Sequence, residues 1–242
     1  MKLHESTVLN NIDKFQCNTH SNAKDRLMRD REGIYLVWKT IEYHRPKSIL
    51  EIGFGCGETL GIMIEAAGEN CTRVVSNDIT YKNKKTQFDQ LFPENQIEFI
   101  EMSSRNLHLN EKFDFIMIDG DHLYQGVCHD INSCISLLHK NSILCIDDYL
   151  WPEIDRAIQD TLITPQSEFV PFLCAHQQIF FHHRDHSVED FLDQWLIEID
   201  SRFINYTPRD YHGYSIVNGH LHDIMYVENN QIFQLALKYE NL

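Results

Sequence analysis

The chain lacks any long hydrophobic run. Over 242 residues, charged side chains interrupt the apolar segments well before the roughly 18 residues that a membrane-spanning helix needs. The N-terminal segment contains acids and has no apolar core of the kind found in signal peptides. We therefore expect a cytoplasmic protein that does not associate with membranes.

Positive charge is scarce as well. Lysine and arginine total 21 against 36 aspartate and glutamate residues, which gives a formal net charge of −15. This balance disfavours a nucleic-acid partner, because binding a phosphate backbone requires basic side chains. The length fits one large domain with extensions, and a hydrophobic content of 43% is enough for a substantial core.

CxxC pairs are absent. The seven cysteines are odd in number and widely spaced, which indicates free thiols in a reducing compartment rather than a disulfide framework or a zinc site. They are Cys17, Cys56, Cys71, Cys128, Cys134, Cys145 and Cys174.

Short apolar runs alternate with segments of helical periodicity. The expected strands are Ser48–Ile52, Thr72–Asn77, Gln96–Glu101, Phe113–Asp119 and Ser142–Asp147, followed by a hairpin of Phe169–Cys174 and Gln178–His182. The expected helices are Asn22–His44, Glu58–Ala67, Lys84–Phe92, Leu123–His139, Pro152–Leu162 and Val188–Ile199. This alternation predicts an α/β fold: a doubly wound, mostly parallel sheet with a C-terminal antiparallel strand pair and a helical N-terminal extension.

The same pattern suggests three parts. We expect residues 1–46 to form an N-terminal arm and helical extension, residues 47–183 the core, and residues 184–242 an extension packed on the core. The tail after Arg202 is rich in Tyr, His and Asn, and we expect it to be irregular. In a parallel sheet, ligands bind beyond the carboxyl ends of the strands, so the residues that follow each strand are the first candidates for a site.

Gly53, Gly55 and Gly57 follow the first expected strand and precede a helix. Such a turn lets the backbone approach a ligand closely and presents helix N–H groups to it. The run is neither a GxGxxG fingerprint nor a P-loop. Asp78, one strand later, could accept hydrogen bonds from two ribose hydroxyls. The alternative is that the glycines serve only to make the turn.

Carboxylates end two neighbouring strands. Asp119 follows Phe113–Ile118 and is succeeded by Gly-Asp-His, while Asp147 and Asp148 follow the run that starts at Ser142. These oxygens could converge on one Mg²⁺ ion, or they could simply cap helices and face water. His122 has an ordinary pKa near 6.5, suited to a general base, and its alternative is a supporting hydrogen bond to Asp121 or to backbone.

Other candidates have plainer interpretations. His182, His183 and His186 form an HHxxH string, for which we expect a solvated loop rather than a metal site. Tyr124, Trp151 and the Tyr206–Tyr214 segment could wall a substrate pocket, and Tyr149 could line it or pack.

Four strings together resemble the class I S-adenosylmethionine-dependent methyltransferases: LEIGFGCGETL, SNDIT, FDFIMIDGDHLYQGVCHDI and ILCIDDYLWPEIDRAI. The resemblance is greatest to the methyltransferase domain 24-like, metal-dependent O-methyltransferases that act on sugars or catechol-type small molecules. It covers roughly Lys47 to Leu162. It implies a Rossmann-like fold.

The resemblance also implies roles for individual residues. Cofactor-binding residues would be Glu51, Gly53 and Gly55 near the methionine part, Thr59 near its carboxylate, Asp78 at the ribose, Ser103 and Ser104 near the adenine, and Asp119. The Mg²⁺ ligands would be Asp119, Asp147 and Asp148. Asp119 and His122 would be catalytic, His122 as general base.

We therefore expect a methyltransferase that uses S-adenosylmethionine and Mg²⁺ to methylate a hydroxyl of a small molecule, with homo-oligomerisation possible. Two alternatives stay open. One is a metal-independent enzyme that methylates a nitrogen or a carboxylate. The other is a module that binds S-adenosylmethionine without catalysis, which intact acids at Asp119, Asp147 and Asp148 argue against.

Overall fold

A computed structural model describes residues 6–10, 31–81, 84–92, 97–175 and 177–188, together with the backbone of three further strands at 203–210, 223–228 and 231–237. The helices are α1 (Thr7–Asn10), α3 (Arg31–His44), α4 (Glu58–Ala67), α5 (Lys84–Leu91), α6 (Tyr124–Ile135) and α7 (Pro152–Thr161). The strands of the amino-terminal half are β1 (Ser48–Ile52), β2 (Arg73–Asp78), β3 (Ile97–Glu101), β4 (Phe113–Ile118) and β5 (Leu138–Ile146). They are followed by β6 (Phe169–Ala175), β7 (Gln178–His183), β8 (Phe203–Asp210), β9 (Asp223–Glu228) and β10 (Gln231–Leu237).

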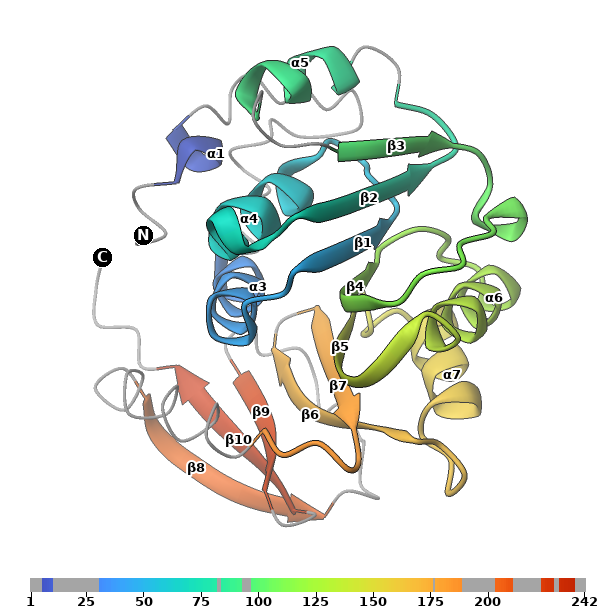
Figure 1. Ribbon diagram of the computed structural model, residues 1–242. Helices are drawn as coiled ribbons and strands as arrows, with labels where there is room; N and C mark the ends of the chain where they lie inside the picture. The colour runs from blue at the N-terminus through green and yellow to red at the C-terminus, as the bar shows by residue number, and fades with distance from the viewer. Residues whose placement is uncertain are drawn as a thin grey trace.

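The strands form one mixed sheet in the order β3-β2-β1-β4-β5-β7-β6, continued by β9-β10-β8 (Figure 1). The first five strands of that order are parallel, and β7 pairs antiparallel with both β5 and β6. This arrangement confirms the predicted doubly wound sheet and its C-terminal antiparallel pair. It also brings the carboxyl ends of β1, β2, β3, β4 and β5 to one edge.

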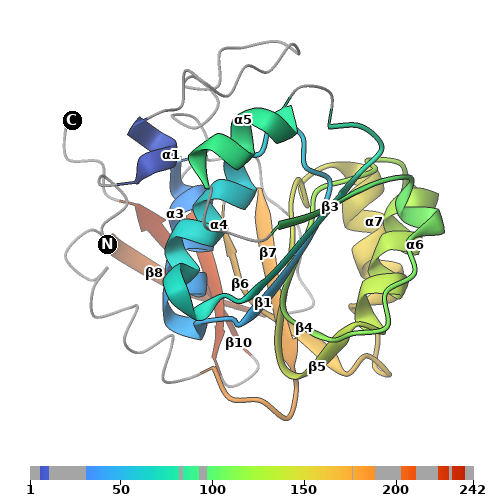
Figure 2. The same ribbon diagram turned by 45° about the horizontal axis from the view of Figure 1, so that its top comes forward.

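Helices cover both faces of the sheet (Figure 2). On one face α3, α4 and α5 pack over a cluster that includes Trp38, Leu60 and Phe88. On the other face α6 and α7 pack over a cluster that includes Ile131 and Ile158. Within the part of the chain that the structure describes, no helix is long and apolar enough to cross a membrane.

The short helix α1 belongs to the N-terminal extension and is attached to α4. The backbone N–H of Val8 donates to Oε1 of Glu65 at 2.9 Å, and the Ser6 hydroxyl donates to the other oxygen. Val8 is fully buried above Gly61, where a Cβ would lie 2.6 Å from the valine side chain. A glycine in α4 therefore makes room for the extension.

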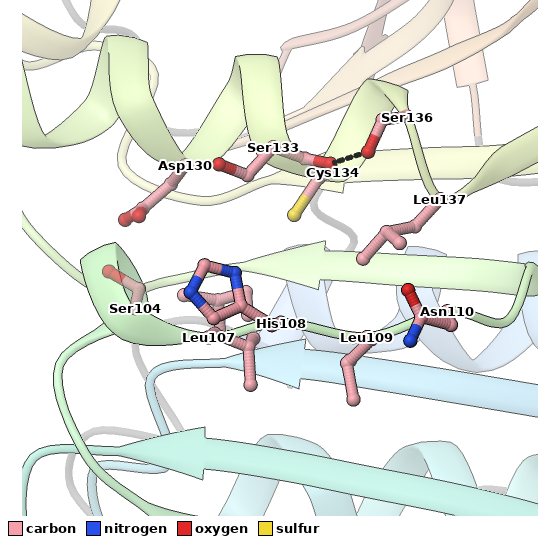
Figure 3. A pocket seen from close by; sticks show the side chains of 11 residues that line it. Ser104, Leu107, His108, Leu109, Asn110, Asp130, Ser133, Cys134, Ser136 and Leu137 are labelled. Carbon is pink, nitrogen blue, oxygen red and sulfur yellow. Dashed lines mark hydrogen bonds between the residues drawn. The ribbon is translucent and has the colours of Figure 1, made fainter.

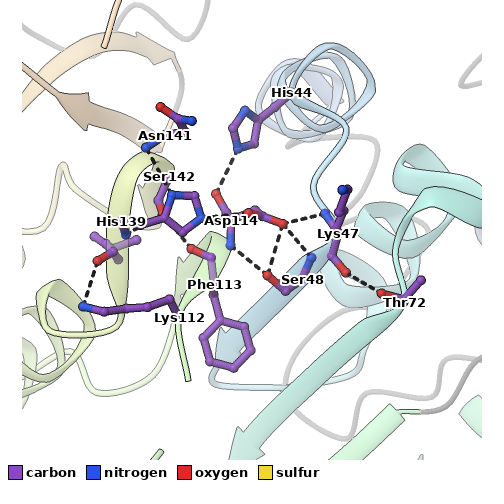
Figure 4. Close-up of polar contacts among 11 residues, drawn as sticks. His44, Lys47, Ser48, Thr72, Lys112, Phe113, Asp114, His139, Asn141 and Ser142 are labelled. Atoms are coloured by element: carbon purple, nitrogen blue, oxygen red, sulfur yellow. Dashed lines mark hydrogen bonds and ion pairs between the residues drawn. The ribbon is translucent and has the colours of Figure 1, made fainter. Parts of the chain in front are cut away.

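Asp114 joins the amino ends of three parallel strands (Figure 4). Its Oδ2 accepts from the backbone N–H groups of Lys47 and Ser48 at 2.7 and 3.0 Å. Its Oδ1 lies 2.7 Å from Nε2 of His139, and its backbone carbonyl lies 3.0 Å from Nε2 of His44. This cluster lies at the edge opposite the carboxyl ends, so we expect it to contribute to stability rather than to ligand binding.

Two sequence predictions about secondary structure are wrong, and a third is not tested. Helix α6 ends at Ile135 rather than His139, because Leu138 pairs with Phe113 and begins β5. The tail after Arg202 is not irregular, since β8, β9 and β10 pair with one another and β9 pairs with β6. The helix predicted at Val188–Ile199 lies almost wholly outside the described residues.

The cysteine prediction is partly wrong. Cys71, Cys128, Cys134 and Cys145 are free thiols, as expected. Cys56, in the glycine turn, is disulfide-bonded instead, and its partner is not among the residues whose side chains are described.

Candidate active site

The turn after β1 is built on left-handed glycines. Gly53, Gly55 and Gly57 have φ values of 94°, 54° and 87°. A Cβ on Gly53 would lie 1.9 Å from the carbonyl oxygen of Asp119, so the turn touches the end of β4 directly. A Cβ on Gly55 would meet nothing within 4 Å. The turn therefore leaves open space at Gly55, as approach by a ligand requires.

Asp78, at the end of β2, holds this turn in place. Its Oδ2 accepts from the N–H groups of Phe54 and Gly55 at 2.8 and 3.1 Å, and its Oδ1 accepts from Thr80 at 3.0 Å. A carboxylate offers about four acceptor positions. Three backbone N–H groups already occupy most of these positions, and Asp78 can accept one further hydrogen bond from a hydroxyl.

Glu51 lies beneath the turn rather than in the open space above it. Its side chain is buried within β1, and Oε2 accepts from the Ser76 hydroxyl at 3.0 Å. Burial raises the pKa of Glu51 to about 8, because the charged form loses its hydration. The structure therefore places Glu51 in position to support the turn from below.

The two serines after β3 differ in surroundings. Ser103 caps the short 3-10 helix Ser104–Asn106, accepting from the N–H of Arg105. Ser104 lines a cavity of about 230 Å³ between this segment and α6 (Figure 3). Asp130 of α6 faces the same cavity and is 2% exposed, and burial raises the pKa of its carboxyl group. The sequence does not single out Asp130, because an acid within an amphipathic helix carries no distinctive signal.

Side chains from β4 and β5 converge beside the glycine turn. One ligand atom each from Asp119, His122 and Asp148 lie within 4.8 Å of one another. Nε2 of His122 is 2.7 Å from Oδ2 of Asp148, and Nδ1 is 3.2 Å from the carbonyl oxygen of Gly120. The hydrogen bond to Asp148 is the main reason that the pKa of His122 is raised. Two carboxylates and an imidazole are a donor set that fits a divalent cation.

The other acids of the two strand ends face elsewhere. Oδ1 of Asp147 accepts from Nε2 of Gln178, in β7, at 2.5 Å. Asp147 is therefore not a member of the group of three among the described residues. Asp121 accepts from the N–H of Leu123 at 2.9 Å and packs against Gly126, so it orders the start of α6.

Exposed apolar side chains surround these strand ends. Five of the six large hydrophobic residues that are exposed in the described part of the chain follow the carboxyl end of a strand. They are Ile79, Met102, Leu123, Leu150 and Trp151. These side chains offer apolar contacts to a ligand bound at this edge. Ile79 and Met102 were missed from the sequence, although each comes directly after a strand.

The HHxxH string lies only partly in the predicted loop, because His186 is in the turn after β7 and is half-buried. His182 and His183 belong to β7, and the ring of His182 lies 5.3 Å from that of Phe172. Burial lowers the pKa of His182 to about 4. His182 and His183 are thus packing residues of the sheet.

Comparisons with known proteins agree with this geometry. Residues 50–149, less than half of the chain, match a family model described as a methyltransferase domain. That stretch contains the glycine turn and the convergent side chains of both strands. No protein of curated function matches the chain.

Solved methyltransferases share the fold. The S-adenosylhomocysteine-bound methyltransferase PaMTH1 of Podospora anserina is 17% identical, with a TM-score of 0.57 over 74% of this chain and 88% of its own. An O-methyltransferase of Bacillus cereus in complex with S-adenosylhomocysteine is 14% identical, with a TM-score of 0.51 over 62% and 79%. CalS11, a TDP-rhamnose 3′-O-methyltransferase of calicheamicin biosynthesis, is 14% identical, with a TM-score of 0.51 over 72% and 89%.

Proposed function

We propose that this S-adenosylmethionine-dependent methyltransferase methylates a hydroxyl of a small molecule, with a divalent cation held between Asp119 and Asp148. One observation carries the proposal. The group of Asp119, His122 and Asp148 lies directly beside the glycine turn, because the backbone of Asp119 touches Gly53. A cofactor over the turn and a cation between the acids would therefore be neighbours.

The cofactor site follows from the turn. Gly53 and Gly55 would let the methionine part approach the backbone, with Thr59 in the first turn of α4 near its carboxylate. Asp78 would contact the ribose, Ser103 and Ser104 would lie near the adenine, and Glu51 would support the turn. The exposed side chains of Ile79 and Met102 offer apolar surface for the flat adenine ring.

Methyl transfer to oxygen needs an activated hydroxyl. The carbon–sulfur bond of the sulfonium breaks as the carbon–oxygen bond forms, and the hydroxyl loses its proton. A divalent cation held by Asp119 and Asp148 would lower the pKa of a coordinated hydroxyl toward neutrality and would orient it, and Mg²⁺ is the ion predicted from the sequence. The protein supplies proximity and alignment of the two reactants.

His122 is proposed near the reacting hydroxyl in one of two roles. As a general base it would accept the proton, and Asp148 would stabilise the resulting imidazolium. As a ligand it would give its Nε2 lone pair to the cation. The two roles exclude each other at Nε2, because one lone pair serves either a proton or a metal.

The surroundings favour an acceptor with an apolar or aromatic part. Trp151 is 54% exposed, and its ring lies 5.3 Å from that of His122 in an edge-to-face arrangement. Leu123 and Leu150 are exposed at the same strand ends. A phenolic or catechol-type hydroxyl would find both an activating centre and a stacking surface here.

A panel of acceptors tests the proposal. The full-length protein is incubated with methyl-labelled S-adenosylmethionine and catechols, sugars, amines or carboxylic acids, and products are identified by mass spectrometry. We expect label on oxygen of a hydroxylated acceptor, with Asp119→Asn strongly impaired. Glu69→Gln is the matched control, because it removes one exposed negative charge at the amino edge of β2. Transfer only to nitrogen or carboxylate, or cofactor binding without transfer to any acceptor, contradicts the proposal.

A further inference from the structure

The side chain that completes the cation-binding group is an imidazole. Asp119, His122 and Asp148 each place a donor atom within 4.8 Å of the other two. Donors on a six-coordinate ion with bonds of about 2.1 Å are roughly 3 Å apart when adjacent and roughly 4 Å apart when opposite. The observed spacing therefore lets all three donors reach one ion with small adjustments.

Asp147, the third carboxylate expected from the sequence, is engaged elsewhere. Gln178 donates to its Oδ1 at 2.5 Å from the neighbouring strand β7. Gln178 is itself buried, at 6% exposure, so this contact is held within the sheet. The side chains that meet at this point are thus one imidazole and two carboxylates, in place of three carboxylates.

The imidazole is also oriented as metal-binding histidines are. Nδ1 of His122 lies 3.2 Å from the carbonyl oxygen of Gly120. A histidine ligand usually donates its other ring N–H to a carbonyl or carboxylate, which fixes the tautomer and leaves the remaining nitrogen for the metal. The Trp151 ring, packed edge-to-face at 5.3 Å, limits rotation of the imidazole. This backbone contact is independent of the acidic pair and points Nε2 at Asp148.

A tight backbone turn directs the side chain of Asp148 toward His122. Its φ of 54° lies in the left-handed region, and Trp151 donates its N–H to the Asp148 carbonyl at 2.8 Å. Aspartate tolerates this conformation better than most residues do. The side chains of these sequence neighbours therefore point to different partners, Asp148 to His122 and Asp147 to Gln178.

We infer that His122 is a metal ligand and that the centre selects Mn²⁺ over Mg²⁺. This inference rests on the proposed function for the position of the cation, but it concerns the identity of the ion. Mg²⁺ is a hard ion that prefers oxygen donors, whereas imidazole nitrogen strengthens binding of first-row transition ions. Exchanging one carboxylate for an imidazole therefore shifts preference from Mg²⁺ toward Mn²⁺, which also accepts oxygen ligands.

The test is metal binding by the chelator-treated, full-length protein without substrate. Mn²⁺ titrations are followed by the electron paramagnetic resonance signal of free Mn²⁺, and Mg²⁺ affinity is obtained by competition. We expect Mn²⁺ to bind at least about ten-fold more tightly than Mg²⁺. His122→Ala should lose most of that preference, while Asp147→Asn, which retains an acceptor for Gln178, should keep it. Circular dichroism confirms that each variant is folded.

A spectroscopic signature checks the ligand directly. The electron spin-echo modulation of Mn²⁺-loaded wild-type protein should contain ¹⁴N couplings from one imidazole, absent in His122→Ala. Equal affinities for the two ions, no Mn²⁺ binding, or no ¹⁴N coupling overturns the inference. Loss of this signature with intact methyl transfer refutes only the ligand assignment. Its presence without methyl transfer to any hydroxyl refutes only the proposed function.

Discussion

Nε2 of His122 lies 2.7 Å from Oδ2 of Asp148, and this contact joins the loop after β4 to the loop after β5. Neither residue is deeply buried, with side-chain exposures of 38% and 17%. An exposed ion pair contributes little to stability. The position of the pair at the carboxyl edge of the sheet, beside the glycine turn, supports the catalytic role proposed for it.

Asp148→Asn removes the charge from this pair while retaining the shape of the side chain. We expect kcat for methyl transfer to fall by at least about ten-fold, because the variant loses one of the two carboxylates proposed to hold the cation. S-adenosylhomocysteine should bind with nearly unchanged affinity by calorimetry. Wild-type kcat in this variant would remove Asp148 from the catalytic centre, and Glu69→Gln provides the charge-matched control.

Gly53→Ala and Gly55→Ala separate stability from cofactor binding. At Gly53 the added Cβ would overlap the Asp119 carbonyl oxygen at 1.9 Å, so we expect a loss of about 3 kcal/mol or more in the free energy of unfolding. At Gly55 the space is open, and only the positive φ costs about 1–2 kcal/mol. Gly55→Ala should instead weaken S-adenosylhomocysteine binding. Denaturant titration and calorimetry measure the two effects, and equal stability losses would contradict the geometry.

Asp114→Asn tests the cluster at the amino edge. Burial alone would raise the pKa of Asp114, but hydrogen bonds from His139, Lys47 and Ser48 outweigh it and lower the pKa. The ionised carboxylate therefore stabilises the fold fully above its unfolded pKa, near 3.9, and this stabilisation is lost as pH falls through the lower folded value. We expect the variant to lose about 1–2 kcal/mol at pH 7 in urea unfolding. The difference should shrink below about pH 4.

Asp185→Asn is the control for that experiment. Asp185 pairs with Lys140 at 2.9 Å on an exposed surface, so its substitution should change stability much less. Equal effects of the two substitutions, or an Asp114 effect that does not diminish in acid, would contradict the structural role of the cluster.

Glu51→Gln addresses the buried acid beneath the turn. Burial raises the pKa of Glu51 to about 8, so native protein holds a proton that the unfolded chain releases above about pH 4.3. Stability contributed by this site therefore falls as pH rises between those values. The glutamine variant keeps an acceptor for Ser76 and should lose that decline. Parallel curves of unfolding free energy against pH for both proteins would show that Glu51 is ionised in the native state.

Local pattern predicted the amino-terminal half of the sheet well. The bounds of β1 and α4 agree with the sequence prediction, because a glycine turn and Gly68 mark their ends. The predicted helix α6 was too long at its C-terminal end, since Leu138 suits a helical face and a strand equally. Leu138 adopts the strand conformation because it pairs with Phe113, which is distant in sequence. Strands β8, β9 and β10 were missed for a similar reason, since they pair largely with one another.

The location of the candidate site can be predicted from the sequence, but the set of side chains that meet there cannot. The alternation of strands and helices places Asp119 and Asp148 at strand ends, so both residues are predictable from the sequence. The sequence offers no way to separate Asp147 from Asp148, because the distinction depends on a left-handed backbone at Asp148 and on Gln178 from β7. The pairing of His122 with Asp148 likewise depends on how two loops meet.

The most direct test of the account is transfer of a trideuteromethyl group from labelled S-adenosylmethionine to a catechol-type acceptor, before and after removal of divalent cations. We predict a product carrying the label on oxygen, formation of one S-adenosylhomocysteine per product, loss of turnover with chelator, and recovery when a divalent cation is restored. The cation-assisted mechanism would be contradicted if the chelator does not reduce turnover of the wild-type protein and Asp119→Asn turns over as fast as wild type.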